Sequence, residues 1–417
     1  MGAQSGGPRL LIYSQDGLGL GHQRRTTLLA AEFLAAEPSA SVLTICDSPV
    51  GQFFSTAPGH EHLKLPSVRK VGPGNWTPVS LSMPFTDVLA VRKEIIRATA
   101  LSFRPDALLV DHMPHGAMGE LVPALEALEG KGVRTVLGLR DILDAPATIR
   151  QRWHLEGAFE AVEHYYDDVL VYGSRHVFDV AAEYGWPSAI SSRLQYCGYI
   201  CSPAPVVPRE RLRNRYLRDD PDAALVVAMA GGGADGSRLF ETLVRSVPKL
   251  LSAQRCVVLV VTGPFLPVEE RAKLKELARD LPIVLRESVP DAIAYLDAAD
   301  LVVAMAGYNT TAEILSLGKR ALLVPRSGPS AEQRLRASGF AERGWVHWLS
   351  PDELSETALA EAMSSVLASP PAVVTDRPDL RGRQRAVEHL LARGAQVLPI
   401  PAHEDRDPSA GLMSGEA

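Results

Sequence analysis

The sequence is short of cysteine and has no long apolar run, and each shortage excludes a class of protein. Its four cysteines are spread over 417 residues, and only Cys197 and Cys201 lie close together, without a second Cys or His pair to complete a zinc site. We therefore expect free, mostly buried thiols in a reducing compartment. No stretch of about 18 apolar residues and no signal-peptide pattern occurs, so we expect a cytoplasmic protein.

An excess of positive charge is also missing. The formal net charge is -6, which gives no basic surface for nucleic acid, and we expect no nucleic-acid partner. With 46% hydrophobic and 22% charged residues the composition is that of an ordinary globular protein. Because 417 residues exceed what one hydrophobic core usually supports, we expect two domains of about 200 residues each.

Apolar runs of strand length alternate with helical stretches along the whole chain, which predicts an α/β fold with two Rossmann-like parallel-sheet domains. The expected strands are Arg9–Ser14, Ser41–Cys46, Ala107–Asp111, Arg134–Arg140, Asp168–Gly173, Gln195–Ile200, Leu225–Ala230, Val257–Gly263, Ile283–Glu287, Leu301–Ala306 and Arg320–Pro325. The Pro-rich piece over 203–215 is the predicted linker between domains over 1–202 and 216–398. A last helix is expected over 377–394, and a disordered tail over 399–417.

One heptapeptide, LVVAMAG, occurs twice, at Leu225–Gly231 and at Leu301–Gly307. Each copy leads from a predicted strand through a turn into a helix, and a helix N-terminus with exposed backbone N–H groups binds anions. We therefore predict a diphosphate site, although either turn alone could be a plain connector. The predicted contacts are Gly231, Gly232, Gly233 and Ser237 after the first copy, and Asn309, Thr310 and Thr311, which we also expect to cap their helix, after the second.

Carboxylates and an amide follow the second copy. Glu313 lies within one helical turn of the Gly307 turn, where a carboxylate can accept hydrogen bonds from ribose hydroxyls. Glu332 and Gln333 follow the predicted strand Arg320–Pro325, at the carboxyl edge where open parallel sheets bind ligands. Together these residues predict a site for a nucleotide sugar.

The N-terminal half carries a second motif, in which Gly17, Gly19 and Gly21 precede His22 and Arg25. The glycine spacing differs from the G-x-G-x-x-G of dinucleotide-binding folds. We interpret the loop as a close backbone approach to a ligand, with His22 at the start of a helix over 23–36 as a general base. The alternative is that His22 only caps this helix.

Further polar residues stand at predicted strand ends in the first domain, where they would line the same cleft. Asp111 could orient His22, and Arg140 could balance the charge of a diphosphate or an acceptor. His112 and Asp141 are the other candidates, although Arg140 and Asp141 could be a surface ion pair and a strand-end His a simple cap. Pro114 separates His112 from His115 and no third ligand lies near, so we expect no metal.

Residues 225–345 resemble the C-terminal domain of the family 28 glycosyltransferases, which include the N-acetylglucosaminyltransferase of peptidoglycan synthesis. The resemblance implies the GT-B fold, with Gly231–Gly236 near the phosphates, Thr310 and Thr311 bordering them, Glu313 on the ribose, and Glu332 and Gln333 on the donor sugar. Ser237 would replace a hydroxyl that the family carries within its Gly-rich loop. Tyr308 replaces a small residue that is usual after the turn glycine.

The N-terminal motif, G-x-G-H-x-x-R over 19–25, resembles the Gly-loop of nucleotide-sugar hydrolases of the same fold. Over nearly its whole length the chain resembles a group of predicted bacterial glycosyltransferases. The resemblance implies a UDP-sugar donor by default and a small-molecule or lipid acceptor, with peripheral membrane contact left open.

The predicted activity is metal-independent, inverting transfer of a sugar to an acceptor hydroxyl, with no cofactor, since no Asp-x-Asp motif ends a predicted strand. The alternatives are a nucleotide-sugar hydrolase or epimerase that uses the same His22, and a non-catalytic subunit that binds sugar nucleotides.

Overall fold

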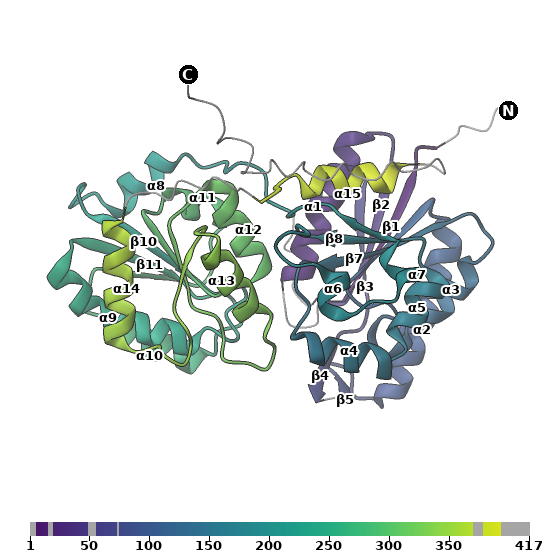
Figure 1. Ribbon diagram of the computed structural model, residues 1–417, viewed down its shortest axis with the longest axis horizontal. Helices are drawn as coiled ribbons and strands as arrows, with labels where there is room; N and C mark the ends of the chain where they lie inside the picture. The colour runs from purple at the N-terminus through teal and green to yellow at the C-terminus, as the bar shows by residue number, and fades with distance from the viewer. Residues whose placement is uncertain (1–5, 16–19, 49–55, 73–74, 370–377, 393–417) are drawn as a thin grey trace, which may run out of the picture.

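The computed structural model describes residues 6–15, 20–48, 56–72, 75–369 and 378–392. They form two α/β domains that lie side by side, each with a central sheet between helices (Figure 1). Every strand pair in the two large sheets is parallel, as the alternation of apolar runs and helices predicted. The predicted tail over 399–417 and Gly19 lie outside the described residues.

The N-terminal domain has a seven-stranded sheet in the order β3-β2-β1-β6-β7-β8-β9. Its central strands are almost entirely buried, because helices cover both faces. The strands are β1 Arg9–Ser14, β2 Ser41–Cys46, β3 His60–Lys64, β6 Ala107–Asp111, β7 Arg134–Arg140, β8 Asp168–Tyr172 and β9 Leu194–Tyr196. The helices are α1 Gly21–Ala36, α2 Phe85–Phe103, α3 Val122–Leu128, α4 Pro146–Leu155, α5 Ala158–Tyr165, α6 Val180–Tyr184 and α7 Ser188–Ser191.

The C-terminal domain has a six-stranded sheet in the order β12-β11-β10-β13-β14-β15. The two copies of the heptapeptide form β10 and β13, which are neighbours, so the turns that follow them share one sheet edge. The strands are β10 Ala224–Met229, β11 Cys256–Val261, β12 Ile283–Arg286, β13 Leu301–Ala304, β14 Ala321–Leu323 and β15 His347–Trp348. The helices are α8 Arg209–Tyr216, α9 Ser237–Ala253, α10 Val268–Leu277, α11 Ala292–Ala298, α12 Tyr308–Leu317, α13 Glu332–Glu342, α14 Glu356–Ala368 and α15 Gly382–Leu391.

Several elements differ from the sequence prediction, and β3 and β15 were not among the expected strands. β9 ends at Tyr196, because Gly198 has a positive φ of 86°. The next backbone N–H, that of Tyr199, donates to the carbonyl oxygen of Asp379 at 2.7 Å. α8 begins inside the predicted linker and packs on α11 of the second domain, where Arg213 pairs with Asp300 at 2.8 Å. An unpredicted antiparallel hairpin, β4 Val68–Gly72 with β5 Asn75–Pro78, projects from the N-terminal domain.

The last helix, α15, returns to the N-terminal domain and packs along α1 (Figure 1). Arg383 of α15 pairs with Glu32 of α1 at 2.9 Å. One apolar cluster joins this helix, the α1 side of the first sheet and the interior of the second domain. The two domains meet through this cluster, where the rings of Tyr199 and Tyr308 stack with centroids 6.0 Å apart.

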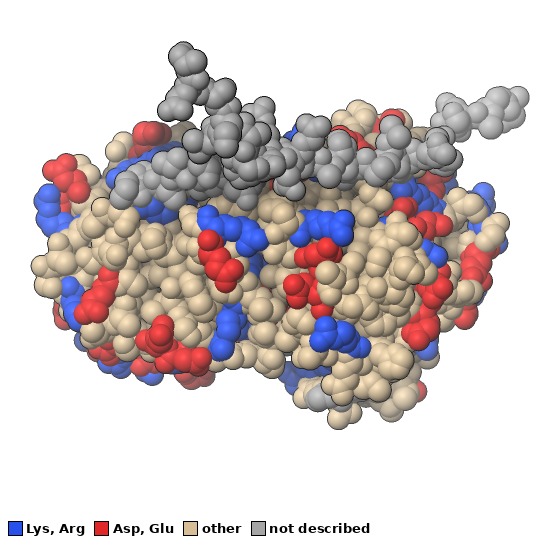
Figure 2. All heavy atoms as spheres, in the orientation of Figure 1, with Lys and Arg blue, Asp and Glu red and all other residues tan. Residues whose placement is uncertain are grey.

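Basic and acidic side chains are interspersed over the face shown in Figure 2, without a large area of one sign. Across the part of the chain that the structure describes, no helix has both the length and the apolar character needed to cross a bilayer. The four cysteines are buried and free, and burial raises the pKa of the Cys201 thiol to about 12, so this thiol stays protonated at neutral pH.

Candidate functional site

His22 is held by a buried carboxylate at the start of α1. Its Nδ1 lies 2.5 Å from Oδ2 of Asp111, the last residue of β6, which is the strand beside β1. The N-cap position of α1 is Leu20, so the interpretation of His22 as a helix cap is wrong. The predicted contact between His22 and Asp111 is present, and it is the geometry by which a carboxylate orients a general base.

Arg25 fixes the charge of Asp111. Its guanidinium contacts both carboxylate oxygens, at 2.8 and 2.7 Å, and both residues are buried. Burial alone would raise the pKa of Asp111, but the charges of Arg25 and His22 hold that pKa below its usual value. Asp111 is therefore ionised at neutral pH. The guanidinium of Arg25 also lies over the rings of Tyr172 and Tyr308, 5.4 Å from each centroid, so it contacts both domains.

A pocket of about 390 Å³ opens beside His22 within the N-terminal domain. Its wall comes from the ends of β1 and β6, the start of α1, the β4–β5 hairpin, and α4 with the residues that follow it. Besides His22 the pocket is lined by Gln15, Val68, Arg69, Lys70, Trp76, His112, Met113, Pro114, His115, Gly116, Arg152, Trp153, Glu156 and Ala158. The candidate base thus faces a space large enough for a small molecule.

His112 lies in the wall of this pocket, with its ring centroid 5.1 Å from that of His22. Its φ of 81° is uncommon for a residue with a side chain, and such strain is found at functional sites. Burial, followed by the charges of Arg140, His22 and Arg25, holds the pKa of His112 well below its usual value. Its imidazole is therefore neutral. Among the described residues, no three His, Cys, Asp or Glu side chains are grouped as metal ligands.

The Gly-rich turn after β10 is closely packed against the rest of the C-terminal domain. Gly231 and Gly233 have φ values of 58° and 92°, and a Cβ on Gly233 would lie 2.0 Å from the carbonyl oxygen of Thr262. Only glycine fits there. α9 begins at Ser237, directly after this turn, so its first backbone N–H groups lie at the same sheet edge.

The start of α12 differs in detail from the prediction. Gly307 is the N-cap, so Asn309, Thr310 and Thr311 lie in the first turn and none caps the helix with its side chain. The Thr311 hydroxyl is buried and donates to the backbone oxygens of Gly307 and Tyr308, at 2.9 Å each, so it stabilises the turn from inside. Asn309 Nδ2 instead donates to the carbonyl oxygen of Gly21 across the domain boundary, at 3.0 Å.

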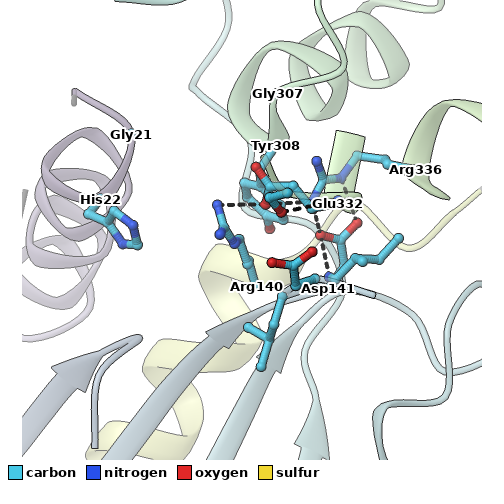
Figure 3. Close-up of polar contacts among 12 residues, drawn as sticks. Gly21, His22, Arg140, Asp141, Gly307, Tyr308, Glu332 and Arg336 are labelled. Atoms are coloured by element: carbon cyan, nitrogen blue, oxygen red, sulfur yellow. Dashed lines mark hydrogen bonds and ion pairs between the residues drawn. The ribbon is translucent and has the colours of Figure 1, made fainter. Parts of the chain in front are cut away.

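The two carboxylates predicted to contact the donor form ion pairs across the same domain boundary. Glu313 pairs with Arg24 of α1 at 2.5 Å and accepts from the Ser202 hydroxyl at 2.7 Å. Glu332 pairs with Arg140 at 2.7 Å (Figure 3). Both carboxylates are nearly inaccessible to solvent, so a donor would have to replace an arginine to reach either of them.

Asp141 binds the second domain through a bidentate ion pair with Arg336 of α13, at 2.6 and 3.0 Å (Figure 3). Arg336 also donates to the carbonyl oxygen of Ala306. The interpretation of Arg140 and Asp141 as a surface ion pair is therefore wrong, because each binds a residue of the other domain. Gln333 is buried and accepts from the backbone N–H of Arg326 at 3.1 Å, which fixes the loop after β14.

Several residues that shape the site were not identified from the sequence. Arg24 and Arg336 provide the cross-domain partners of Glu313 and Asp141, and Trp76 and Arg69 line the pocket. Only the structure identifies their partners, because arginine on a helix is usually solvated. A basic and aromatic hairpin between two sheet strands is the one signal that could have drawn attention to Arg69 and Trp76.

Comparison with known protein families gives a match in the second domain. Residues 226–389 match the family model described as glycosyltransferase family 28 C-terminal domain, which confirms the resemblance found in the sequence. The UDP-N-acetylglucosamine--N-acetylmuramyl-(pentapeptide) pyrophosphoryl-undecaprenol N-acetylglucosamine transferase of Natranaerobius thermophilus is 26% identical over 178 residues, which are 42% of this chain and 46% of that protein. The enzyme of the same name from Rhodospirillum rubrum is 33% identical over 156 residues, 36% of this chain and 40% of that protein. The alignments thus span less than half of each relative.

Solved structures share the fold over nearly the whole chain. The calicheamicin glycosyltransferase CalG4 aligns with a TM-score of 0.56 at 15% identity, over 92% of this chain and 94% of that one. MurG of Acinetobacter baumannii aligns with a TM-score of 0.54 at 14% identity, over 92% and 98%. A putative UDP-N-acetylglucosamine 2-epimerase from Listeria monocytogenes aligns with a TM-score of 0.61 at 13% identity, over 92% and 94%. The chain shares the GT-B fold of these structures.

Proposed function

We propose that this chain, whose residues 226–389 form a glycosyltransferase family 28 C-terminal domain, transfers a sugar from a nucleoside diphosphate sugar to an acceptor hydroxyl. The proposed reaction is a metal-independent displacement with inversion at the anomeric carbon, and UDP is the default nucleotide. One observation carries the proposal. The hydrogen bond from Asn309 to the Gly21 carbonyl brings the residue next to His22 against the start of α12, where the donor diphosphate is predicted to bind.

In the proposed step, His22 removes the proton of the acceptor hydroxyl. When Nδ1–H donates to Asp111, the lone pair that accepts a proton is on Nε2, and Asp111 then stabilises the imidazolium that forms. The acceptor oxygen attacks the anomeric carbon on one face while the bond from that carbon to the diphosphate oxygen breaks on the other. The leaving diphosphate keeps the electron pair.

The leaving group is stabilised by the C-terminal domain in this proposal. The Gly231–Gly233 turn and the N-termini of α9 and α12 present backbone N–H groups and positive helix ends at one sheet edge. Arg140, which now pairs with Glu332, can turn to the diphosphate when the donor sugar takes that carboxylate. No metal ion or cofactor is needed for this step.

A hydrolase or epimerase is the alternative, since the same His22 could act on water or on the sugar itself. A non-catalytic subunit fits less well, because it has no need of a carboxylate-oriented histidine beside a pocket. The test is release of nucleoside diphosphate from UDP-, GDP- and TDP-sugars, with and without a small-molecule extract of the host cells. Release that depends on the extract supports the transferase. Equal release without it would replace the transferase by a hydrolase, and no release from any donor would leave the epimerase and the binding subunit.

The proposed ribose contact of Glu313 gives a separate prediction. We expect Glu313→Ala to weaken UDP binding about 10- to 100-fold, because a hydrogen bond to a charged group is worth about 1.5–3 kcal/mol. Isothermal titration calorimetry measures the affinity. Arg24→Ala is the matched control, because it breaks the same ion pair from the other side. Since Arg24 competes with the ribose for the carboxylate, Arg24→Ala should bind UDP at least as tightly as the natural chain. Equal weakening in both variants would mean that only the ion pair matters.

A further inference from the structure

The pocket beside His22 carries positive charge that the proposed mechanism does not use. Arg69, Lys70 and Arg152 line it, against one carboxylate, that of Glu156. Within the described residues none of these three cations forms an ion pair. Three cations against one carboxylate leave an excess of positive charge, which costs electrostatic energy that an anionic ligand would relieve.

The cations come from two separate elements that converge on one cavity. Arg69 and Lys70 lie on β4 of the hairpin, and Arg152 lies in the last turn of α4. Both Arg69 and Lys70 are exposed, whereas Arg152 is half-buried. Two elements far apart in the chain thus contribute cationic residues to the lining of one pocket.

The remaining wall offers an apolar face. Trp76 stands opposite Lys70 in the hairpin register and is half-buried. Trp153 also lines the pocket, and it packs against Trp186 with ring centroids 4.9 Å apart. Val68, Met113 and Pro114 complete this face. Aromatic walls stack on flat or apolar ligand bodies, while guanidinium and ammonium groups bind acidic oxygens.

The electrostatic field at His112, in the wall of the pocket, is also positive. The neutral state of His112 arises in part from the positive charges of Arg140, Arg25 and Arg152 around it. His22 itself lies in this wall, so a ligand held by the cations would present its own hydroxyl to the base.

We propose that the acceptor carries an acidic group, a phosphate or a carboxylate, which Arg69, Lys70 and Arg152 bind while its apolar body rests on Trp76 and its hydroxyl meets His22. This inference rests on the proposed function, because it assigns the acceptor of the same reaction. It is argued from residues of the N-terminal domain, which the family match over residues 226–389 does not cover.

Binding of two matched pairs of probes tests the proposal without turnover. The first pair is phenyl β-glucoside and its 6-phosphate, and the second is octyl β-glucoside, below its micelle concentration, and its 6-phosphate. Titration calorimetry should show each pair's phosphate bound about tenfold or more tightly than its neutral partner, with the difference shrinking as salt rises. The pair with the larger difference shows whether the acceptor is a ring compound or an acidic lipid headgroup.

The triple variant Arg69→Ala, Lys70→Ala, Arg152→Ala should abolish the preference. Its control is Lys131→Ala, Arg211→Ala, Lys275→Ala, which removes three exposed cations elsewhere and should keep the preference. Equal binding of neutral and phosphorylated probes by the natural chain, or a preference that survives in the triple variant, would overturn the proposal. UDP affinity, measured on the same samples, tests the proposed function separately. A natural chain that did not bind UDP would contradict the proposed function, whatever its preference among the probes.

Discussion

A His22→Ala variant is expected to transfer sugar about 10²- to 10⁴-fold more slowly than the natural chain, the usual contribution of a general base. The variant should fold normally, because Asp111 keeps its ion pair with Arg25 and no buried charge loses its partner. Its affinity for UDP should hardly change, because the predicted nucleotide contacts lie in the other domain. The measurement is turnover, as UDP release with saturating acceptor, set beside UDP affinity by calorimetry.

His154→Ala is the matched control for this experiment. His154 lies on α4, near the pocket, but it is exposed and does not line the pocket. Its removal should leave turnover within the error of the assay. Normal turnover in His22→Ala would refute the assignment of the base, whereas a loss of both turnover and UDP affinity would show that His22 positions the domains.

Removal of the Asp141 carboxylate is expected to have the largest effect on stability. Arg336 is fully buried and forms a bidentate pair with Asp141, so Asp141→Ala leaves its charge with only the longer contact to Glu332, at 4.0 Å, in the domain interface. Breaking one side of such a pair costs about 3–5 kcal/mol. The cost should appear as weaker docking of the domains, because opening the interface lets water reach Arg336.

Scanning calorimetry and small-angle scattering measure this outcome. We expect the thermal transition to move down and to separate into two, and the radius of gyration to rise. The double variant Asp141→Leu, Arg336→Met should recover most of the loss, since an apolar pair of similar size carries no buried charge. Glu361→Ala breaks an exposed ion pair with Lys249 and should leave the transition unchanged. An unchanged transition in Asp141→Ala would mean that the domains do not depend on this contact.

The sequence predicted the strands whose pairing depends on their own apolar residues. β1, β6, β10 and β13 are continuous apolar runs, and a strand buried on both faces has to look like this. β9 ends earlier than predicted because its end is set by a distant segment, through the contact between Tyr199 and Asp379. The β4–β5 hairpin is half polar and exposed, so it lacks the alternating pattern by which strands are recognised.

From the sequence we could name the candidate site residues, but not the residues that they contact. The contact of His22 with Asp111 followed from placing both at one sheet edge, which topology decides. The pairing of Glu313 with Arg24, and of Asp141 with Arg336, depends on how the two domains are turned toward each other. No spacing along the chain encodes that orientation. The roles proposed for Glu332, Gln333, Thr310 and the Gly231–Gly233 turn remain predictions.

The return of α15 to the N-terminal domain has a consequence for biosynthesis. Ala386, Val387 and Leu390 belong to the same apolar cluster as Leu29 and Phe33 of α1. When the first domain leaves the ribosome, this side of α1 therefore has no cover, and it gains one only after translation has reached Leu391. The nascent chain spends the whole synthesis of the second domain with that surface open to chaperones. A gene cut at the linker would produce a first domain that keeps this exposure permanently.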